Sequence, residues 1–163
     1  MPLVKDGIEI EDIWSYVSDD TAIEPDGCFT VSLSRYLNST DNLRASNDCV
    51  GVRLTPDDDP TLLAAHLDKI GLIEISFPKY TDGRGYSQAQ LLRRRFKYAG
   101  EIRAVGQVLR DQILYMHRSG FNAYETERAD LSSVLEALTE YSEYYQPAAV
   151  SSTTVFQRRH AKA

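Results

Sequence analysis

Residues 72–105, "LIEISFPKYTDGRGYSQAQLLRRRFKYAGEIRAV", contain two short apolar runs separated by a segment with helical periodicity. The runs at 72–77 and 101–105 carry β-branched residues, which is typical of buried strands. Between them, Leu92, Phe96 and Ala99 recur at the spacing of one face of a helix. A strand, a helix and a second strand in this order predict a β-α-β unit with two parallel strands.

The same rhythm continues on both sides, from residue 49 to residue 145. Four consecutive β-α units predict an α/β fold with a mostly parallel sheet. The sheet could be open and flavodoxin-like, or curved like half of a (β/α)8 barrel. The strands and helices that we expect are 49–54 with 60–70, 72–77 with 88–99, 101–105 with 107–119, and 121–125 with 127–145.

Both ends of the chain differ from this pattern. "LVKDGIEIED" (3–12) is typical of a hairpin or paired extended segment, and "GCFTVSLSRYL" (27–37) of a strand that runs into a helix. We expect one domain over 1–146 and a tail over 147–163, whose composition is small and polar. Ordering of this tail would require Val155 and Phe156 to pack on another surface, and exchange of tails in a homodimer would provide one.

Composition excludes several classes of protein. The formal net charge is −6, and "TPDDDP" (55–60) is strongly acidic, so nucleic acid is not an expected partner. No run is long and apolar enough to cross a membrane, and we expect a cytoplasmic protein. Cys28 and Cys49 are too far apart for a metal knuckle or a redox pair, so no metal is expected.

The loop 82–87, "DGRGYS", lies where ligands collect in both sheet geometries, at the carboxyl end of a strand. Ser87 and Gln90 fit a capping box, which predicts a helix beginning at Gln88 with free N–H groups. Such a helix start could hold a small oxyanion or the phosphate of a nucleotide. Neither Gly-x-Gly-x-x-Gly nor a Walker A sequence is complete, so a tight turn without a ligand is an equal alternative.

Two arginines are candidates for binding that anion, Arg84 in the loop and Arg103 in the next strand-to-helix connection. The alternative is that they pair with Asp82, Glu101 or Asp111. Asp111 itself could orient an arginine or be a solvated helix residue. No catalytic triad or cofactor sequence is present. The ligand-binding residues that we expect are Asp82, Gly83, Arg84, Gly85, Tyr86, Ser87, Arg103, Gly106 and Asp111.

The segments "DGRGYS" (82–87), "GEIRAVG" (100–106) and "VLRDQ" (108–112) resemble domain-of-unknown-function family 934. The resemblance covers about 51–124. These bacterial proteins are commonly described as oxidoreductases of sulfite reduction and occur beside sulfite reductase and sulfonucleotide reductase. The resemblance therefore implies a place in assimilatory sulfate reduction.

This chain departs from the family pattern at Ser119, where a cysteine is usual, and at Gln107, where an aspartate is common. A redox role for that cysteine could not operate here. Two functions follow. One is an accessory protein or oxidoreductase of sulfite reduction that binds its ligand at the strand ends. The other is a non-catalytic interaction module that docks on a sulfite or sulfonucleotide reductase through its acidic surface or its tail.

Overall fold

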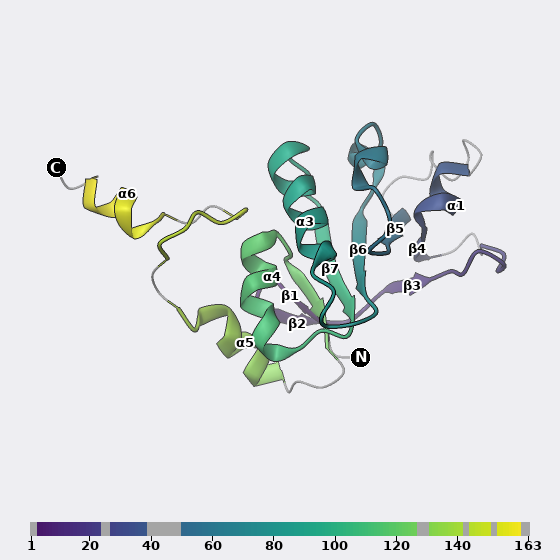
Figure 1. The fold of residues 1–163 in the computed structure, drawn as a ribbon. Coiled ribbons are helices and arrows are strands. Elements are labelled where there is room, and N and C mark those ends of the chain that lie inside the picture. The colour runs from purple at the N-terminus through teal and green to yellow at the C-terminus, as the bar shows by residue number, and fades with distance from the viewer. Residues whose placement is uncertain are drawn as a thin grey trace.

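The computed structural model describes residues 3–23, 27–38, 50–126, 131–141, 144–150 and 153–160. These residues build one eight-stranded sheet with the strand order β2-β1-β8-β7-β6-β5-β4-β3. From β3 to β8 all neighbours are parallel, whereas β1 joins β8 and β2 antiparallel (Figure 1). The sheet is therefore mostly, but not wholly, parallel. The strands are β1 (Leu3–Lys5), β2 (Ile8–Ile10), β3 (Trp14–Tyr16), β4 (Cys28–Ser32), β5 (Val50–Leu54), β6 (Leu72–Phe77), β7 (Glu101–Gly106) and β8 (Ala123–Glu125).

The helices are short. Short 3₁₀ and π turns separate or extend them: η1 and η2 follow β5, a π turn η3 extends α3, and η4 precedes α4. The helical elements are α1 (Leu33–Asn38), η1 (Pro60–Leu63), η2 (Leu67–Lys69), α3 (Arg84–Gln90), η3 (Leu91–Arg95), η4 (Arg110–Gln112), α4 (Ile113–Ser119), α5 (Leu131–Thr139) and α6 (Val155–His160).

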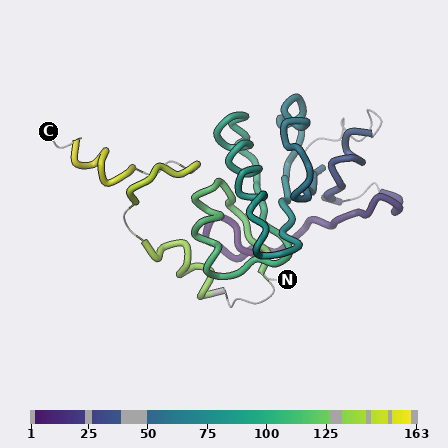
Figure 2. Tube along the Cα trace, in the orientation of Figure 1, coloured from purple at the N-terminus to yellow at the C-terminus, as the bar shows by residue number. Residues whose placement is uncertain are grey.

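The connection between β2 and β3 requires the sheet to curl. These two strands form opposite edges of the sheet, yet only residues 11–13 join them. Seven strand spacings would separate the edges of a flat sheet by about 34 Å. Four Cα steps from Ile10 to Trp14 span at most about 14 Å. The sheet accordingly curls into a half-barrel, as expected for one of the two alternative geometries, and residues 11–13 run across its concave face (Figures 1 and 2).

The two faces of the sheet have different chemistry because side chains alternate along each strand. On β6, Ile73, Ile75 and Phe77 belong to the buried apolar core beneath the helices, with Val134 and Ala137 of α5 in the same cluster. The intervening Glu74 lies on the concave face. The core therefore occupies the helical side, and charged residues occupy the inside of the curl.

Several sequence expectations need correction. The helix expected at 60–70 is two 3₁₀ turns, with Asp59 capping the first through the amide of Thr61 at 2.9 Å. Gly71 N donates to Val50 O, which ties the end of this segment to the start of β5. A 3₁₀ turn rises about 2.0 Å per residue against 1.5 Å in an α-helix, so the tighter turns cover this path with fewer residues.

The helix after the 82–87 loop begins at Arg84, not at Gln88. Asp82 Oδ1 accepts from the Arg84 amide at 3.1 Å, and Ser87 lies exposed inside the helix instead of capping it. The next helix, α4, begins at Ile113 after the η4 turn and ends at Ser119. Gly120 follows as its cap, and its φ of +118° matches the expected glycine cap. The helix expected from Glu127 is described from Leu131, and Cys49 lies outside the described residues.

Candidate functional site

Arg84 is already paired at the strand-end loop. Its Nε and Nη2 donate to Asp82 at 3.0 and 2.7 Å, and its Nη1 donates to Asp57 at 2.5 Å. Hydrogen bonds from Arg84 hold the pKa of the Asp82 carboxyl down at about 2. The guanidinium therefore lies between two carboxylates on an exposed surface, which is the ion-paired alternative that the sequence left open.

Gly85 of this loop and Gly106 at the end of β7 are required by packing. A Cβ on Gly85 would lie 2.7 Å from Phe77 Cζ and 2.9 Å from Ile75 Cγ2, so only glycine lets α3 approach β6 this closely. Gly106 has φ +92°, and a Cβ there would lie 2.8 Å from Phe77 O. Gln107 N donates to the same carbonyl at 2.8 Å. Both positions are explained without a ligand.

The other expected site residues are divided between the core and the surface. Tyr86 packs edge-on against Phe77 and Phe121, with ring centroids 5.6 and 6.4 Å away, and burial followed by the charge of Asp111 raises the pKa of its hydroxyl. Ser87, Gly83 and Asp111 are exposed. Arg103 lies apart from the contiguous loop residues Asp82, Gly83, Arg84, Gly85, Tyr86 and Ser87.

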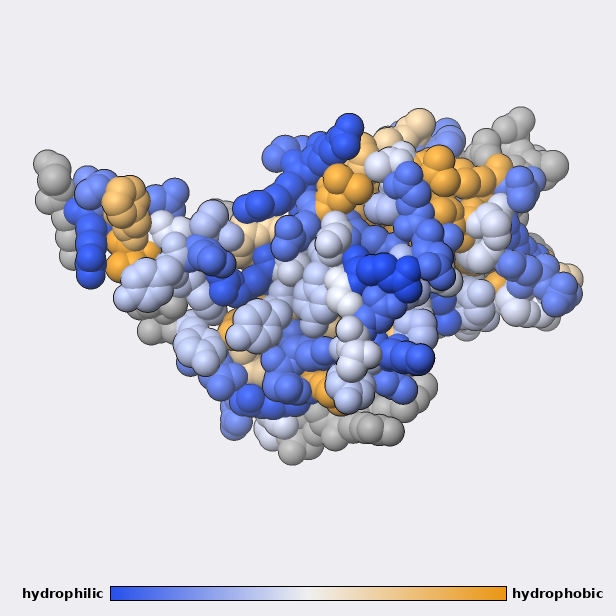
Figure 3. Space-filling view, viewed as in Figure 1, coloured by the Kyte–Doolittle hydropathy of each residue, from blue (hydrophilic) through white to orange (hydrophobic). Residues whose placement is uncertain are grey.

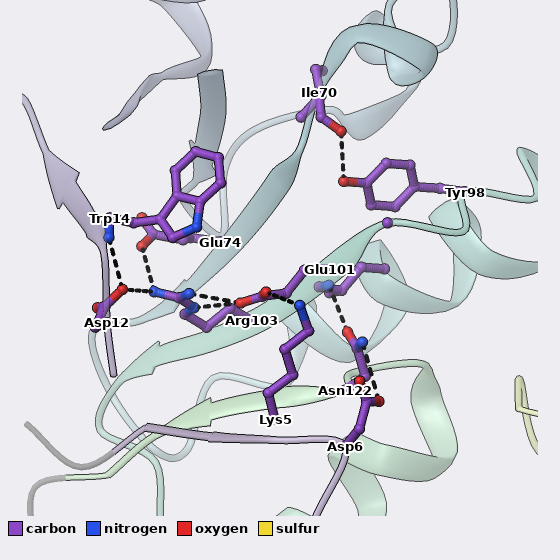
Figure 4. Close-up of polar contacts among 12 residues, drawn as sticks. Lys5, Asp6, Asp12, Trp14, Ile70, Glu74, Tyr98, Glu101, Arg103 and Asn122 are labelled. Carbon is purple, nitrogen blue, oxygen red and sulfur yellow. Dashed lines mark hydrogen bonds and ion pairs between the residues drawn. The ribbon is translucent and has the colours of Figure 1, made fainter. Parts of the chain in front are cut away.

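Arg103 lies in the middle of β7 on the concave face, and only 1% of it is exposed. Its Nε and Nη2 bond to Glu101 Oε1 at 2.8 and 2.7 Å, and its Nη1 bonds to Asp12 Oδ1 at 2.9 Å (Figure 4). Burial lowers the pKa of Arg103, but Glu101 and Asp12 outweigh burial and raise it. The expected convergence of Arg84 and Arg103 on one anion is therefore not found. The register places Arg103 opposite Glu74 within the sheet, not at its end.

Further ion pairs extend this network across the curl. Glu101 also accepts Lys5 Nζ at 2.9 Å, and Glu74 accepts Arg53 Nε at 2.7 Å and Thr30 Oγ1 at 2.8 Å. The guanidinium of Arg53 lies 4.0 Å from the ring centre of Tyr16. We call Lys5, Asp12, Arg53, Glu74, Glu101 and Arg103 the concave ion network. It joins β1, β5, β6, β7 and the segment 11–13, and its carboxylates are held by cations.

Most of this network was missed from the sequence, although a signal was present. "VGVRL", "LIEISF" and "EIRAV" each place a charged residue inside an apolar run, at Arg53, Glu74 and Arg103. Parallel pairing sets Arg53 beside Glu74 and Glu74 beside Arg103. Charges that recur inside adjacent strands indicate a polar inner face, because a flat sheet covered on both sides would need apolar residues there.

Two adjoining cavities lie on the other side of the molecule, where the C-terminal chain crosses α4. The first, which we call the tyrosine cavity, has a volume of about 390 Å³ and is lined by Tyr115, Tyr141, Tyr144 and Tyr145. The second, the arginine cavity, has a volume of about 280 Å³ and is lined by Tyr86, Gln90, Arg94 and Ser119. Tyr115, Arg118 and Gln146 border both.

Backbone contacts hold residues 146–149 over α4. Ala149 N donates to Arg118 O at 2.8 Å, and Arg118 Nη2 donates to Gln146 O at 3.0 Å. Arg94 Nη2 reaches Ala148 O at 3.4 Å. The start of the tail is therefore bound to its own domain, with no second copy required.

Beyond this segment, α6 projects away from the sheet (Figures 1 and 2). Phe156 is 66% exposed on α6, and apolar surface is visible there in Figure 3. Its ring packs edge-on against His160, with the ring centres 4.2 Å apart, and Arg158 and Arg159 are exposed beside it. We call residues 153–160 the C-terminal arm.

The described residues hold no cluster of three or more histidine, cysteine or acidic side chains arranged for a metal ion. Among the helices of this part of the chain, none has the length and apolar character needed to cross a bilayer.

Comparison with known families agrees with the sequence segments quoted above. The family of bacterial proteins of unknown function DUF934 matches residues 51–156, about two thirds of the chain. The chain belongs to this family. No curated protein and no solved structure gave a significant match. The family match extends beyond the expected 51–124 and includes α5, residues 144–149 and the arm as far as Phe156.

The two departures from the family pattern occupy different environments. Ser119 is 7% exposed, at the end of α4 and on the wall of the arginine cavity. Gln107 is exposed beyond β7, and its Oε1 accepts from Tyr80 N at 3.3 Å.

Proposed function

We propose that this protein is a non-catalytic accessory of assimilatory sulfite reduction that docks on a sulfite or sulfonucleotide reductase through its C-terminal arm. The observation that carries the proposal is the exposure of Phe156 on a helix that projects from the domain. Exposed apolar residues on a projecting helix are suited to binding in a groove of another protein. The pathway comes from the family resemblance.

The strand-end loop supports this choice over a stand-alone oxidoreductase. Arg84 is engaged by Asp82 and Asp57, and Arg103 is engaged by Glu101 and Asp12. An oxyanion at the loop would have to displace a carboxylate from Arg84 and enter a region that also carries Asp58 and Asp59. Electrostatic repulsion by these four aspartates opposes that binding.

The charge of the arm defines the chemistry of its partner. Residues 147–163 carry Arg158, Arg159 and Lys162 with no acidic residue, a formal charge of +3, so the net charge of −6 leaves −9 on residues 1–146. A partner groove should therefore be apolar at its centre for Phe156 and acidic at its rim. A second copy of this acidic chain is the competing occupant.

Isothermal titration of the full-length protein with the sulfite reductase and the sulfonucleotide reductase of the same bacterium tests the proposal. We expect binding to one of them, and Phe156→Ser should weaken it by about 2 kcal/mol or more, the scale of a buried aromatic anchor. Leu62→Ser is the matched control, because Leu62 is 53% exposed on η1, away from the arm.

Light scattering of the protein alone separates the two occupants. A dimer that Phe156→Ser converts to a monomer, together with no binding to either reductase, would assign the arm to a second copy and overturn the proposal. Sulfite- or nucleotide-dependent redox turnover by the isolated protein would contradict its non-catalytic role.

A further inference from the structure

The tyrosine and arginine cavities form one continuous site around Arg118. They share Tyr115, Arg118 and Gln146, and each alone is close to the lower limit for a small-molecule pocket. Four separate parts of the chain build the walls: α3 with its π turn, α4, Tyr141, and residues 144–149. The site therefore exists only when the C-terminal segment lies on α4.

Arg118 has unused hydrogen-bonding capacity inside this site. Its Nη2 donates to Gln146 O and its guanidinium lies 4.5 Å from the ring centre of Tyr144. Its Nε is buried and has no hydrogen-bond partner among the described residues. A buried donor left without a partner is unfavourable, and an acceptor from a ligand would remove that cost.

The electrostatics of the arginine cavity differ from those of the strand-end loop. Arg94 and Arg118 both border the arginine cavity, and within the described part of the chain neither forms an ion pair with a carboxylate. Asp111, whose charge acts on Tyr86, does not line the cavity. Two arginines from neighbouring helices can bind one oxyanion through several charge-assisted hydrogen bonds.

The adjoining tyrosine cavity offers aromatic faces to a planar group. Tyr115, Tyr141 and Tyr145 border this hollow and are 59%, 56% and 83% exposed, so their rings are accessible to a ligand. Aromatic side chains stack on heterocycles with little selectivity among bases. A ligand that joins a flat ring to an anionic group would fill both halves.

We propose that this composite site binds a nucleotide, with the base among Tyr115, Tyr141 and Tyr145 and a phosphate held by Arg94 and Arg118. The ligand class is the one considered for the 82–87 loop, but the location is different. The inference is independent of docking by the arm, because residues 153–160 do not line either cavity.

Equilibrium titration of the full-length protein with adenosine monophosphate, followed by NMR, tests the site. We expect a dissociation constant below about 1 mM and shifts of the Tyr115 and Ala149 amides. Arg94→Gln should weaken binding about tenfold or more, since it removes charge-assisted hydrogen bonds to phosphate. Arg95→Gln is the matched control, because Arg95 is also exposed on the same π turn but lines neither cavity.

Arg118→Lys provides a second test that keeps the positive charge. Lysine lacks the planar fork, so we expect weaker binding of the nucleotide and a spectrum that is otherwise that of the folded protein. Adenosine and inorganic phosphate should each bind much more weakly than the monophosphate.

Three results would overturn the assignment. They are an absence of binding at millimolar nucleotide, equal affinity in Arg94→Gln and Arg95→Gln, and phosphate binding as tightly as the nucleotide. The reductase titration with Phe156→Ser can succeed or fail without changing any of these results.

Discussion

Arg103 and Glu101 lie two residues apart on β7, point into the curl of the sheet and form two hydrogen bonds at 2.7 and 2.8 Å. Both are buried, at 1% and 8% exposed. Asp12 completes the set from the segment that crosses the concave face. The ion pairs therefore hold residues 11–13, which connect β2 to β3, against the centre of the sheet. The curl of the sheet allows this short connection to cross the concave face.

Replacing Arg103 by methionine should destabilise the protein severely. Glu101 and Asp12 would lose their shared partner, and the removal of one partner from a buried ion pair costs about 3–5 kcal/mol. Urea denaturation at pH 7 measures this loss. Arg95→Met is the control, because Arg95 is exposed, and its free energy of unfolding should change by less than about 0.5 kcal/mol.

Gly85→Ala should also destabilise, in contrast to the usual gain from alanine in a helix. The methyl group would lie 2.7 Å from Phe77 Cζ and 2.9 Å from Ile75 Cγ2, both of them buried. Overpacking costs about 1–3 kcal/mol, whereas the helical preference of alanine over glycine returns about 1 kcal/mol. The net result should be a loss of about 1 kcal/mol in the free energy of unfolding.

Gly83→Ala is the matched comparison for that variant. Nothing lies within 4 Å of a Cβ built on Gly83, and its φ of −84° suits any residue. It should leave stability unchanged or slightly raised in the same denaturation experiment. Equal stability of the two alanine variants would refute the close-packing explanation for Gly85.

The sequence predicted the sheet better than it predicted the helices. Short apolar runs such as 72–77 and 101–105 strongly favour buried strands, and the structure confirms strands at both. The start of a helix depends on which of several polar residues accepts hydrogen bonds from its first backbone amides. Asp82 accepts from the Arg84 amide, so Asp82 and not Ser87 lies at the start of α3, although both residues fit the local sequence pattern.

The curl and the site could be predicted only in part. Strand β3 is three residues long and carries too little apolar character to be recognised, yet its place at the sheet edge sets the path of residues 11–13. Arg103 lies in the middle of β7 and not at the strand-to-helix connection where we expect it, because strand registers are not readable from one sequence. The cavities depend on residues 144–149, whose position over α4 is a tertiary contact without a local sequence signal.

Ser87→Ala separates the two interpretations of the 82–87 loop. If Ser87 capped the helix, its replacement by alanine would lower the free energy of unfolding by about 1 kcal/mol. Because Ser87 is exposed within α3, alanine should instead stabilise by up to about 0.5 kcal/mol through helix propensity. Thermal unfolding followed by circular dichroism measures the sign, and a clear fall in melting temperature would restore the capping role.

Glu125, at the end of β8, should destabilise the folded protein at neutral pH. Burial first, and then the negative charge of Glu74, raises the pKa of its carboxyl above the usual 4.5. A raised folded pKa contributes stability that is fully present below pH 4.5 and is lost as the pH rises through the folded value. Glu125→Gln removes the charge and should therefore raise the melting temperature at pH 7. The gain should disappear below pH 4.5, where the natural carboxyl is protonated in both the folded and unfolded chains.

Glu136→Gln is the control, because Glu136 is exposed on α5. A lower melting temperature for Glu125→Gln at pH 7 would mean that Arg53 and Arg103 stabilise the Glu125 carboxylate more than burial opposes it.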